Sequence, residues 1–189
     1  MTATPQEPVQ QADHLVWLDL EMTGLDPQTD VILQAALIIT DRELVPLDEY
    51  VCDIWQPESA LAKMTPFVRE MHAKTGLTER VRRSTLDVAQ AEKALFARIA
   101  AWCPFGAGVL AGNSVGQDQR FIQRYMPLVA GYLNYRILDV TSVKLLCRLW
   151  YPEPRQFAKS EEGAHDALVD IKSSIAELAH YRASIFRAD

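Results

Sequence analysis

The order of strand-like and helix-like segments is the feature that most restricts how this chain can fold. Three stretches near its start, Leu15 to Glu21, Val31 to Thr40 and Tyr50 to Trp55, are rich in β-branched and aromatic residues. Turn-forming pairs such as Thr23-Gly24 and Asp26-Pro27 separate them. Because strands joined by short turns run in opposite directions, we expect three antiparallel strands at the beginning of the fold.

Helical segments follow these strands. Thr65-Pro66 is a favourable helix start, because proline fits the first helical position, and Gly76 is a suitable stop. Asp87 to Trp102 carries apolar residues at helical spacing before Pro104. Two helices are therefore expected before the middle of the chain.

The second half of the chain predicts two short strands and more helices. Val109 to Ala111 is typical of a buried strand, and Arg136 to Val140 of another that ends at Asp139, with a helical segment after each. From Ala164 onward we expect one long helix, because apolar residues form a stripe of Leu168, Ile171, Ile175, Leu178 and Tyr181.

The whole pattern predicts an α/β fold in which a mixed sheet is flanked by helices. With no internal repeat and no second core in the sequence, we expect a single domain over residues 14–189. Residues 1–13 are rich in Gln, Pro and small polar residues, and we expect them to form a disordered tail.

Composition and charge exclude several classes of protein. The apolar runs are far shorter than the roughly 18 residues of a membrane-spanning helix. The first basic residue is Arg42, so the amino terminus lacks the basic flank of a secretory signal, and a cytoplasmic protein that makes no membrane contact is expected. The 3 cysteines form no C-x-x-C pair, which argues against a zinc knuckle. A net charge of −6 argues against a protein that holds long nucleic acid by electrostatics, but not against a short nucleic-acid ligand.

Two carboxylates in the first strand indicate a metal site. Asp19 and Glu21 are two residues apart, so in a strand their side chains project from the same face. Two acids among Val, Trp, Leu and Met would repel each other and lose solvation unless a cation lay between them. A hard, oxygen-preferring ion such as Mg²⁺ or Mn²⁺ fits this pair. The alternative is an edge strand whose acids are solvated.

Two further acids are candidate ligands. Asp118 follows Gly112-Asn113-Ser114 and is expected near the first turn of a helix, where an acid commonly serves the helix dipole. Asp170 is the stronger candidate, because it lies between Val169 and Ile171 in the predicted last helix, where a structural acid has little reason to be.

His165 is the candidate base of this site. It precedes Asp170 by five residues, which places the two roughly 140° apart if both are helical. They therefore cannot share one helix face, and His165 must lie at or just before the first turn to reach the same cation. The other histidines, His14, His72 and His180, are first interpreted as surface or internally satisfied residues.

At this point the sequence resembles the DEDDh exonucleases, and within them the oligoribonuclease family. The resemblance covers about residues 14–187, and the first of its motifs is highly specific. It rests on five motifs in order: Trp17 to Asp26, Ala111 to Ser114 with Asp118, Tyr125-Met126-Pro127, Tyr135-Arg136 with Asp139-Val140, and Ala176-Glu177-Leu178 with Tyr181-Arg182.

The resemblance implies a ribonuclease H-like fold, with a mixed sheet of about five strands, and a homodimer. It also implies 3′→5′ degradation of very short RNA, chiefly dinucleotides, to nucleoside 5′-monophosphates. Asp19, Glu21, Asp118 and Asp170 would hold two divalent cations, Mg²⁺ or Mn²⁺, and His165 would act as general base. Two such ions can activate a water and stabilise the leaving 3′ oxygen.

The resemblance further assigns a substrate pocket. Leu25 matches a leucine that wedges between the two bases, and His72 a histidine in the same pocket. Ser114, Arg136 and Thr141 would cap the 5′ phosphate of the substrate, with Tyr135 supplied by the partner subunit. Such a cap would exclude longer chains.

Two positions depart from the family pattern. Phe67 stands where a base-stacking Trp is usual, so weaker stacking is expected. Gln34 stands where a Glu is usual; because it is outside the ligand set, we expect activity to survive with altered local hydrogen bonding.

Two rival functions remain open from the sequence. One is a related DEDDh enzyme, a proofreading or tRNA-trimming exonuclease, which would prefer longer DNA or RNA. The other is a non-catalytic nucleic-acid-binding module on the same fold, which would be expected to have lost one or more of the five active-site residues.

Overall fold

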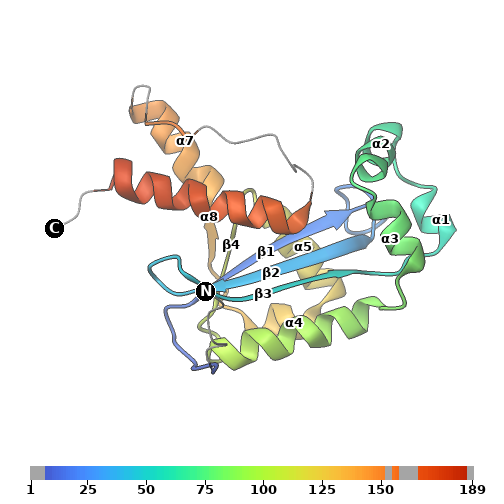
Figure 1. The fold of residues 1–189 in the computed structure, drawn as a ribbon, viewed down its shortest axis with the longest axis horizontal. Helices are drawn as coiled ribbons and strands as arrows, with labels where there is room; N and C mark the ends of the chain where they lie inside the picture. Colours follow the sequence, from blue (N-terminus) through green and yellow to red (C-terminus); the bar gives the residue numbers. More distant parts are fainter. Residues whose placement is uncertain (1–6, 152–154, 158–165, 187–189) are drawn as a thin grey trace, which may run out of the picture.

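A computed structural model describes residues 7–151, 155–157 and 166–186. Within them the chain forms one five-stranded mixed sheet in the order β3-β2-β1-β4-β5, with helices on both faces (Figure 1). The predicted class, an α/β mixed sheet of about five strands flanked by helices, is confirmed. The strands are β1 (Leu15–Met22), β2 (Ile32–Thr40), β3 (Pro46–Asp53), β4 (Val109–Gly112) and β5 (Ile137–Asp139).

The strand pairing begins with the three antiparallel strands that the sequence predicts. The first three strands are antiparallel, β1 with β2 and β2 with β3. β4 returns to lie parallel to β1, and β5 lies parallel to β4. β1 is thus an interior strand, and every residue of β2 is buried.

Eight helices surround this sheet in the described residues. They are α1 (Glu58–Leu61), α2 (Pro66–Lys74), α3 (Leu77–Arg83), α4 (Val88–Trp102), α5 (Gly116–Tyr125), α6 (Pro127–Tyr132), α7 (Val140–Trp150) and α8 (Ala167–Ser184). None of them is both long and apolar enough to cross a bilayer.

Two hydrophobic clusters fill the two faces of the sheet. On one face, α4, α5 and α6 pack against alternate residues of the strands such as Leu18 and Leu37. On the other face, α7 and α8 pack against Trp17 and Ile38. The predicted stripe of the last helix lies in this second cluster, with Ile171, Ile175 and Tyr181 buried, and Leu168 and Leu178 half-buried. In Figure 1, α4 and α8 lie on opposite sides of the strands.

Local capping explains where the predicted helices begin. The Thr65 side chain accepts a hydrogen bond from the backbone of Val68, and proline follows at the first helical position. Asp87 and Gln90 form a capping box at the start of α4. Gly76 adopts φ 71°, a left-handed conformation suited to ending a helix, after α2 has ended at Lys74.

Some boundaries differ from the predicted ones. β3 begins at Pro46, before the predicted Tyr50, because Asp48 and Glu49 give this edge strand a polar sequence. β5 is shorter than predicted: the Asp139 side chain accepts a hydrogen bond from the Thr141 backbone, and α7 therefore begins at Val140. The short helices α1 and α3 were not predicted separately.

The predicted tail is only partly within the described residues. Residues 1–6 lie outside them. Further along, the Gln11 backbone N–H donates to the carbonyl of Trp102 at the end of α4, and the Gln10 side chain donates to the carbonyl of Ala100. One backbone N–H and one side-chain amide thus attach residues 10 and 11 to α4. The composition of the segment did not indicate this attachment.

Candidate active site

Asp19 and Glu21 lie on the α8 side of β1. Leu18 and Leu20 point to the opposite cluster, so the predicted alternation holds along this strand. Glu21 is only 7% exposed and β1 has a neighbour on each side. The alternative of solvated acids on an edge strand is therefore wrong.

Asp170 reaches the same place from the first turn of α8. That helix packs across β1 and β2. A possible ligand atom from each of Asp19, Glu21 and Asp170 lies within 4.8 Å of the other two. Three carboxylates at this separation offer the hard oxygen donors that Mg²⁺ and Mn²⁺ prefer, so the residues fit such a cation.

Asp118 approaches from α5. It lies in the first turn of that helix, as predicted, and is 6% exposed. β4 pairs with β1 only as far as Trp17, and beyond that point the Leu20 N–H donates to Asp118 Oδ1 at 3.0 Å. This hydrogen bond fixes Asp118 to the strand segment that carries the other two acids.

Two of these carboxylates, Glu21 and Asp118, lie where burial disfavours their ionised form. Burial, together with the charges of Asp170, Asp118 and Asp166, raises the pKa of Glu21 to about 8. Burial also raises the pKa of Asp118, although the hydrogen bond from Leu20 opposes this. A divalent cation would offset both effects, because it stabilises the ionised carboxylates in a poorly solvated place.

The beginning of α8 lies next to this cluster. Its first residue is Ala167, and Asp166 caps it by accepting hydrogen bonds from the backbones of Leu168 and Val169 at 3.2 and 3.3 Å. His165, the predicted base, lies outside the described residues. Sequence reasoning missed Asp166, although an Asp directly before an apolar helical stripe is a recognised helix-start signal.

Gln34 ties the start of α8 to the sheet. It is the cross-strand partner of Glu21 and is 3% exposed. Its Oε1 accepts from the Ala167 N–H at 3.2 Å, and its Nε2 donates to Asp53 Oδ1 at 2.7 Å. An amide suits this place, because a glutamate would set a second carboxylate against Asp53. The altered hydrogen bonding expected of Gln34 thus involves the helix that carries Asp170.

Ser114 and Thr141 lie together, as the resemblance implies. The Ser114 N–H donates to Asp139 Oδ1 and to Thr141 Oγ1, both at 2.9 Å, and the two hydroxyl oxygens are 3.2 Å apart. Ser114 has φ 53°, a left-handed conformation uncommon for a residue with a side chain. The loop after β4 is therefore held in a strained form by the start of α7.

The base-contacting candidates have contrasting surroundings. Leu25 and Phe67 are 70% and 73% exposed, as a contact with a ligand requires. His72 has no exposed surface: its Nε2 lies 2.9 Å from the Met22 carbonyl, and its Nδ1 lies 3.8 Å from Glu21 Oε2. The imidazole lies behind Glu21, whereas the resemblance places it in the substrate pocket.

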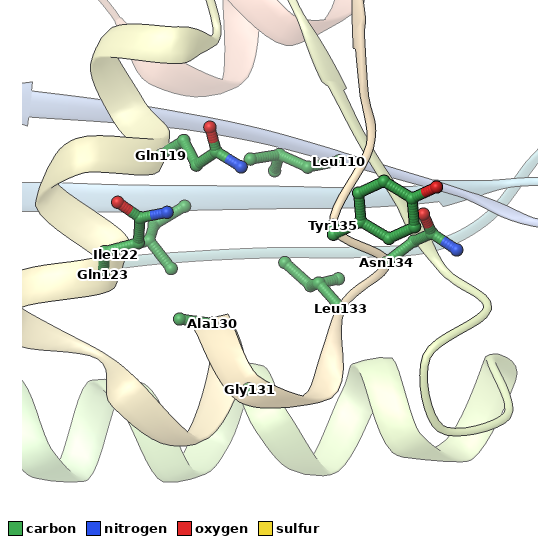
Figure 2. A pocket seen from close by; sticks show the side chains of 9 residues that line it. All are labelled: Leu110, Gln119, Ile122, Gln123, Ala130, Gly131, Leu133, Asn134 and Tyr135. Carbon is green, nitrogen blue, oxygen red and sulfur yellow. The ribbon is translucent and has the colours of Figure 1, made fainter.

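Tyr135 and Arg136 form an exposed pair before β5. The Arg136 guanidinium lies 4.3 Å from the centre of the Tyr135 ring, which is 75% exposed. Figure 2 shows Tyr135 at the rim of a pocket of about 340 Å³, across from Gln119 and Gln123 of α5. Tyr135 thus presents its ring at the surface of its own subunit.

Comparison with known proteins gives a consistent result over most of the chain. The model of a protein family described as Exonuclease matches residues 16–178. An oligoribonuclease of Ectopseudomonas mendocina is 44% identical over 182 residues, which cover 95% of this chain and all of that protein. An oligoribonuclease of Pseudomonas aeruginosa strain PAO1 is 46% identical over 92% of this chain and 97% of its own. The human mitochondrial oligoribonuclease is 45% identical over 93% of this chain and 75% of its own.

Solved structures extend this likeness to the fold. Apo exonuclease I has a TM-score of 0.71 at 18% identity, and E. coli exonuclease I in complex with a dT13 oligonucleotide has one of 0.70 at 18% identity. The matches cover 93% and 91% of this chain. They cover only 43% and 41% of those exonucleases, so this chain spans about two fifths of their length.

Proposed function

Because this chain belongs to the oligoribonuclease family of exonucleases, we propose that it degrades RNA of a few nucleotides, chiefly dinucleotides, to nucleoside 5′-monophosphates in the 3′→5′ direction. The observation that carries the proposal is the cluster of Asp19, Glu21 and Asp170 within 4.8 Å of one another on the sheet face covered by α8. A clustered acid set is what metal-dependent hydrolysis of a phosphodiester requires.

Four carboxylates would hold two divalent cations, Mg²⁺ or Mn²⁺. Three of them, Asp19, Glu21 and Asp170, converge, and Asp118 is anchored beside them through Leu20. Bound there, the cations would lower the pKa of the attacking water and stabilise negative charge on the leaving 3′ oxygen.

His165 would accept the proton of the attacking water. An unperturbed imidazole has a pKa of about 6.5 and can therefore take a proton near neutral pH. Its position in the sequence supports this role, since it directly precedes Asp166, the residue that caps α8 four positions before Asp170.

The substrate would lie between the exposed apolar side chains and the serine–threonine pair. Leu25 and Phe67 would contact the bases, while Ser114, Thr141 and Arg136 would contact the 5′ phosphate. The exposure of Leu25 and Phe67 and the 3.2 Å separation of the Ser114 and Thr141 hydroxyls support this arrangement. His72 would act from beneath the pocket, by holding Glu21 and the Met22 backbone in place.

The protein would act as a cytoplasmic homodimer, with Tyr135 completing the site of its partner. The 75% exposure of Tyr135 supports this, as does an exposed apolar surface on α7 made of Leu145, Leu146, Leu149 and Trp150.

The direct test is hydrolysis of the RNA dinucleotide pApA. Purified protein with Mg²⁺ should release mononucleotides, and Asp19→Asn should lower turnover by about a thousandfold or more, because it removes a charged ligand from the cation site. Circular dichroism checks that this variant remains folded. Absence of hydrolysis by the wild type with fresh metal, or full activity of the variant, would contradict the proposal.

Substrate length separates the proposal from its nearest rival. The proposed enzyme should hydrolyse dinucleotides faster than RNA of five to seven residues, whereas a proofreading or trimming exonuclease should show the reverse order. A binding module would bind RNA without any turnover.

A further inference from the structure

Glu177 is a buried carboxylate that takes no part in the proposed chemistry. It lies on α8, about two turns after Asp170, and has no exposed surface. Lys144 of α7 lies 2.9 Å from its Oε1, and the Tyr181 hydroxyl donates to the same oxygen at 3.0 Å. Its negative charge is therefore compensated, which is the usual condition for a buried acid.

The other oxygen of Glu177 fixes the orientation of Asn113. Asn113 Nδ2 lies 3.0 Å from Glu177 Oε2 and 2.9 Å from Ser174 Oγ. An ionised carboxylate can only accept hydrogen bonds, so the amide group of Asn113 must turn its NH₂ towards α8. Its carbonyl oxygen must then face the opposite way, towards Thr141.

The orientation of Asn113 determines which of the neighbouring hydroxyl groups donates a hydrogen bond and which accepts one. Thr141 Oγ1 donates to Asn113 Oδ1 at 3.1 Å and thereby uses its single proton. The Thr141 oxygen can then only accept, from the Ser114 N–H and, without substrate, from the Ser114 hydroxyl. The single proton of the Ser114 hydroxyl is therefore the one that can turn to a phosphate oxygen when substrate binds. The donor and acceptor roles along the row thus follow from the two acceptors that face the Asn113 NH₂ group, the Glu177 carboxylate and the Ser174 hydroxyl. Of these two, only the carboxylate lacks a proton of its own.

The same row is joined to the turn that carries Asp170. The Ser174 hydroxyl donates to the Asp170 carbonyl at 2.8 Å and accepts from Asn113. Asn113 therefore connects α8 with the loop that holds Ser114 at φ 53°.

We infer that Glu177 is a positioning residue for recognition of the substrate's 5′ phosphate. Through Asn113 it directs the Thr141 proton towards Asn113 and away from the substrate, so the Ser114 hydroxyl is the group that donates to a phosphate oxygen. The inference rests on the proposed function of Ser114 and Thr141. By this inference α8 carries residues that act on both ends of a dinucleotide. Asp170 would lie at the scissile phosphate, and Glu177 would act indirectly on the 5′ phosphate.

The test compares two substrates that differ only at the 5′ end, pApA and the dinucleoside monophosphate ApA. Glu177→Gln keeps the shape of the side chain but can donate as well as accept, so the orientation of Asn113 then depends on the Ser174 hydroxyl alone, which can rotate. We expect the preference for pApA over ApA in kcat/KM to fall about tenfold, mainly through the KM of pApA, because one fixed charge-assisted interaction is lost. Binding of pApA in EDTA, followed by calorimetry, should weaken in parallel.

Tyr181→Phe is the matched control, because it removes a hydrogen bond from the same carboxylate without touching Asn113. It should keep the wild-type preference. Asn113→Leu interrupts the row independently and should lose the preference, so the inference is testable even if Glu177→Gln fails to fold.

The outcomes separate this inference from the proposed function. A wild type that hydrolyses neither substrate refutes the proposed function itself. If the wild type prefers pApA but folded Glu177→Gln or Asn113→Leu keeps that preference, or slows both substrates equally, the positioning role is refuted. A wild type that treats both substrates alike refutes the phosphate cap and this inference with it.

Discussion

Glu21 is buried when the chain folds, although a bound cation requires its carboxylate to be ionised. Its folded pKa of about 8 lies above the ordinary value of 4.5. Between these two pH values the folded protein retains the proton, whereas the unfolded chain releases it. Folding stability in the absence of metal is therefore greatest below about pH 4.5, as far as this group is concerned, and falls as the pH rises towards 8.

Glu21→Gln should remove this trend, because glutamine does not ionise. In EDTA at pH 8 the variant should have a higher melting temperature than the wild type. The difference should be about 5 °C if the loss of the buried charge raises the free energy of unfolding by about 2 kcal/mol, since one pKa unit corresponds to about 1.4 kcal/mol. At pH 4.5 the two should melt together. Differential scanning calorimetry at both pH values measures the effect.

Metal and a surface variant provide the controls for that measurement. Added Mg²⁺ should stabilise the wild type more than Glu21→Gln, because the variant has lost an ionised ligand. Glu70→Gln, which changes an exposed carboxylate on α2, should show little pH-dependent difference. A Glu21→Gln variant that is less stable than the wild type at pH 8 in EDTA would contradict the assignment.

Phe67 should be replaceable by a larger aromatic residue with a gain in affinity. Its side chain is 73% exposed, so Phe67→Trp has room and should leave the melting temperature unchanged. A larger ring surface should lower the KM for pApA about two- to fivefold, and Phe67→Ala should raise it about tenfold, because stacking on one base is worth about 1–3 kcal/mol. Equal KM values for the Trp and Ala variants would show that this ring does not stack on a base.

At the scale of secondary-structure elements, the start of α8 depends on a hydrogen bond from another part of the chain. Gln34 in β2 accepts the Ala167 N–H, and Asp166 accepts the next two backbone N–H groups. Together these side chains hold the helix end at which Asp170 meets β1.

Gln34→Met should loosen this end of α8. The change preserves side-chain length but leaves the Ala167 N–H without its acceptor, so unfolding in urea should become easier by about 1–3 kcal/mol. Turnover of pApA should fall while the KM changes little, because the substrate pocket is untouched. Gln56→Met, which removes a hydrogen bond to the Ile32 carbonyl elsewhere on β2, is the matched control and should leave turnover unchanged.

The same element shows how far the sequence could predict this fold. Periodicity and capping residues predicted the three antiparallel strands, the starts of α2 and α4 and the buried stripe of α8, because these signals are local. The contact between Gln34 and Ala167 spans 133 positions of the chain and leaves no local pattern. The role of Glu177 was hidden for the same reason, since an acid in a helix looks solvated until its neighbours are known.

Parts of the site could likewise be predicted from local spacing, and other parts could not. The spacing of Asp19 and Glu21 predicted their shared face, because alternation in a strand is fixed by geometry. The placement of His72 depends instead on contacts between α2 and the end of β1, where the imidazole meets the Met22 carbonyl and Glu21. Tertiary packing of that kind has no counterpart in residue spacing.

At the scale of the whole molecule, the proposed dimer predicts complementation between inactive subunits. Tyr135→Ala and Asp19→Asn should each lower turnover of pApA, in the partner's site and in the subunit's own site respectively. Mixed under conditions of subunit exchange, they should regain about a quarter of wild-type activity, because half of the dimers are then mixed and each mixed dimer has one intact site.

Sedimentation at assay concentration serves as the control by showing that each variant is dimeric. Mixtures that never exceed the activity of the Tyr135→Ala protein alone would show that Tyr135 acts within its own subunit.

The interior position of β1 has a consequence for how the molecule opens. Asp19 and Glu21 pair with Ala36 and Gln34 of the fully buried β2, and a hydrophobic cluster lies on each face of the sheet. Their amide hydrogens should exchange with solvent only when the whole sheet comes apart. The exposed Leu25 and Phe67, by contrast, lie on a peripheral loop and on the first turn of a short helix, where transient fraying is cheap. The two acids of β1 are thus predicted to be among the slowest-exchanging residues, and the side chains proposed to contact the bases can move without displacing these two ligands.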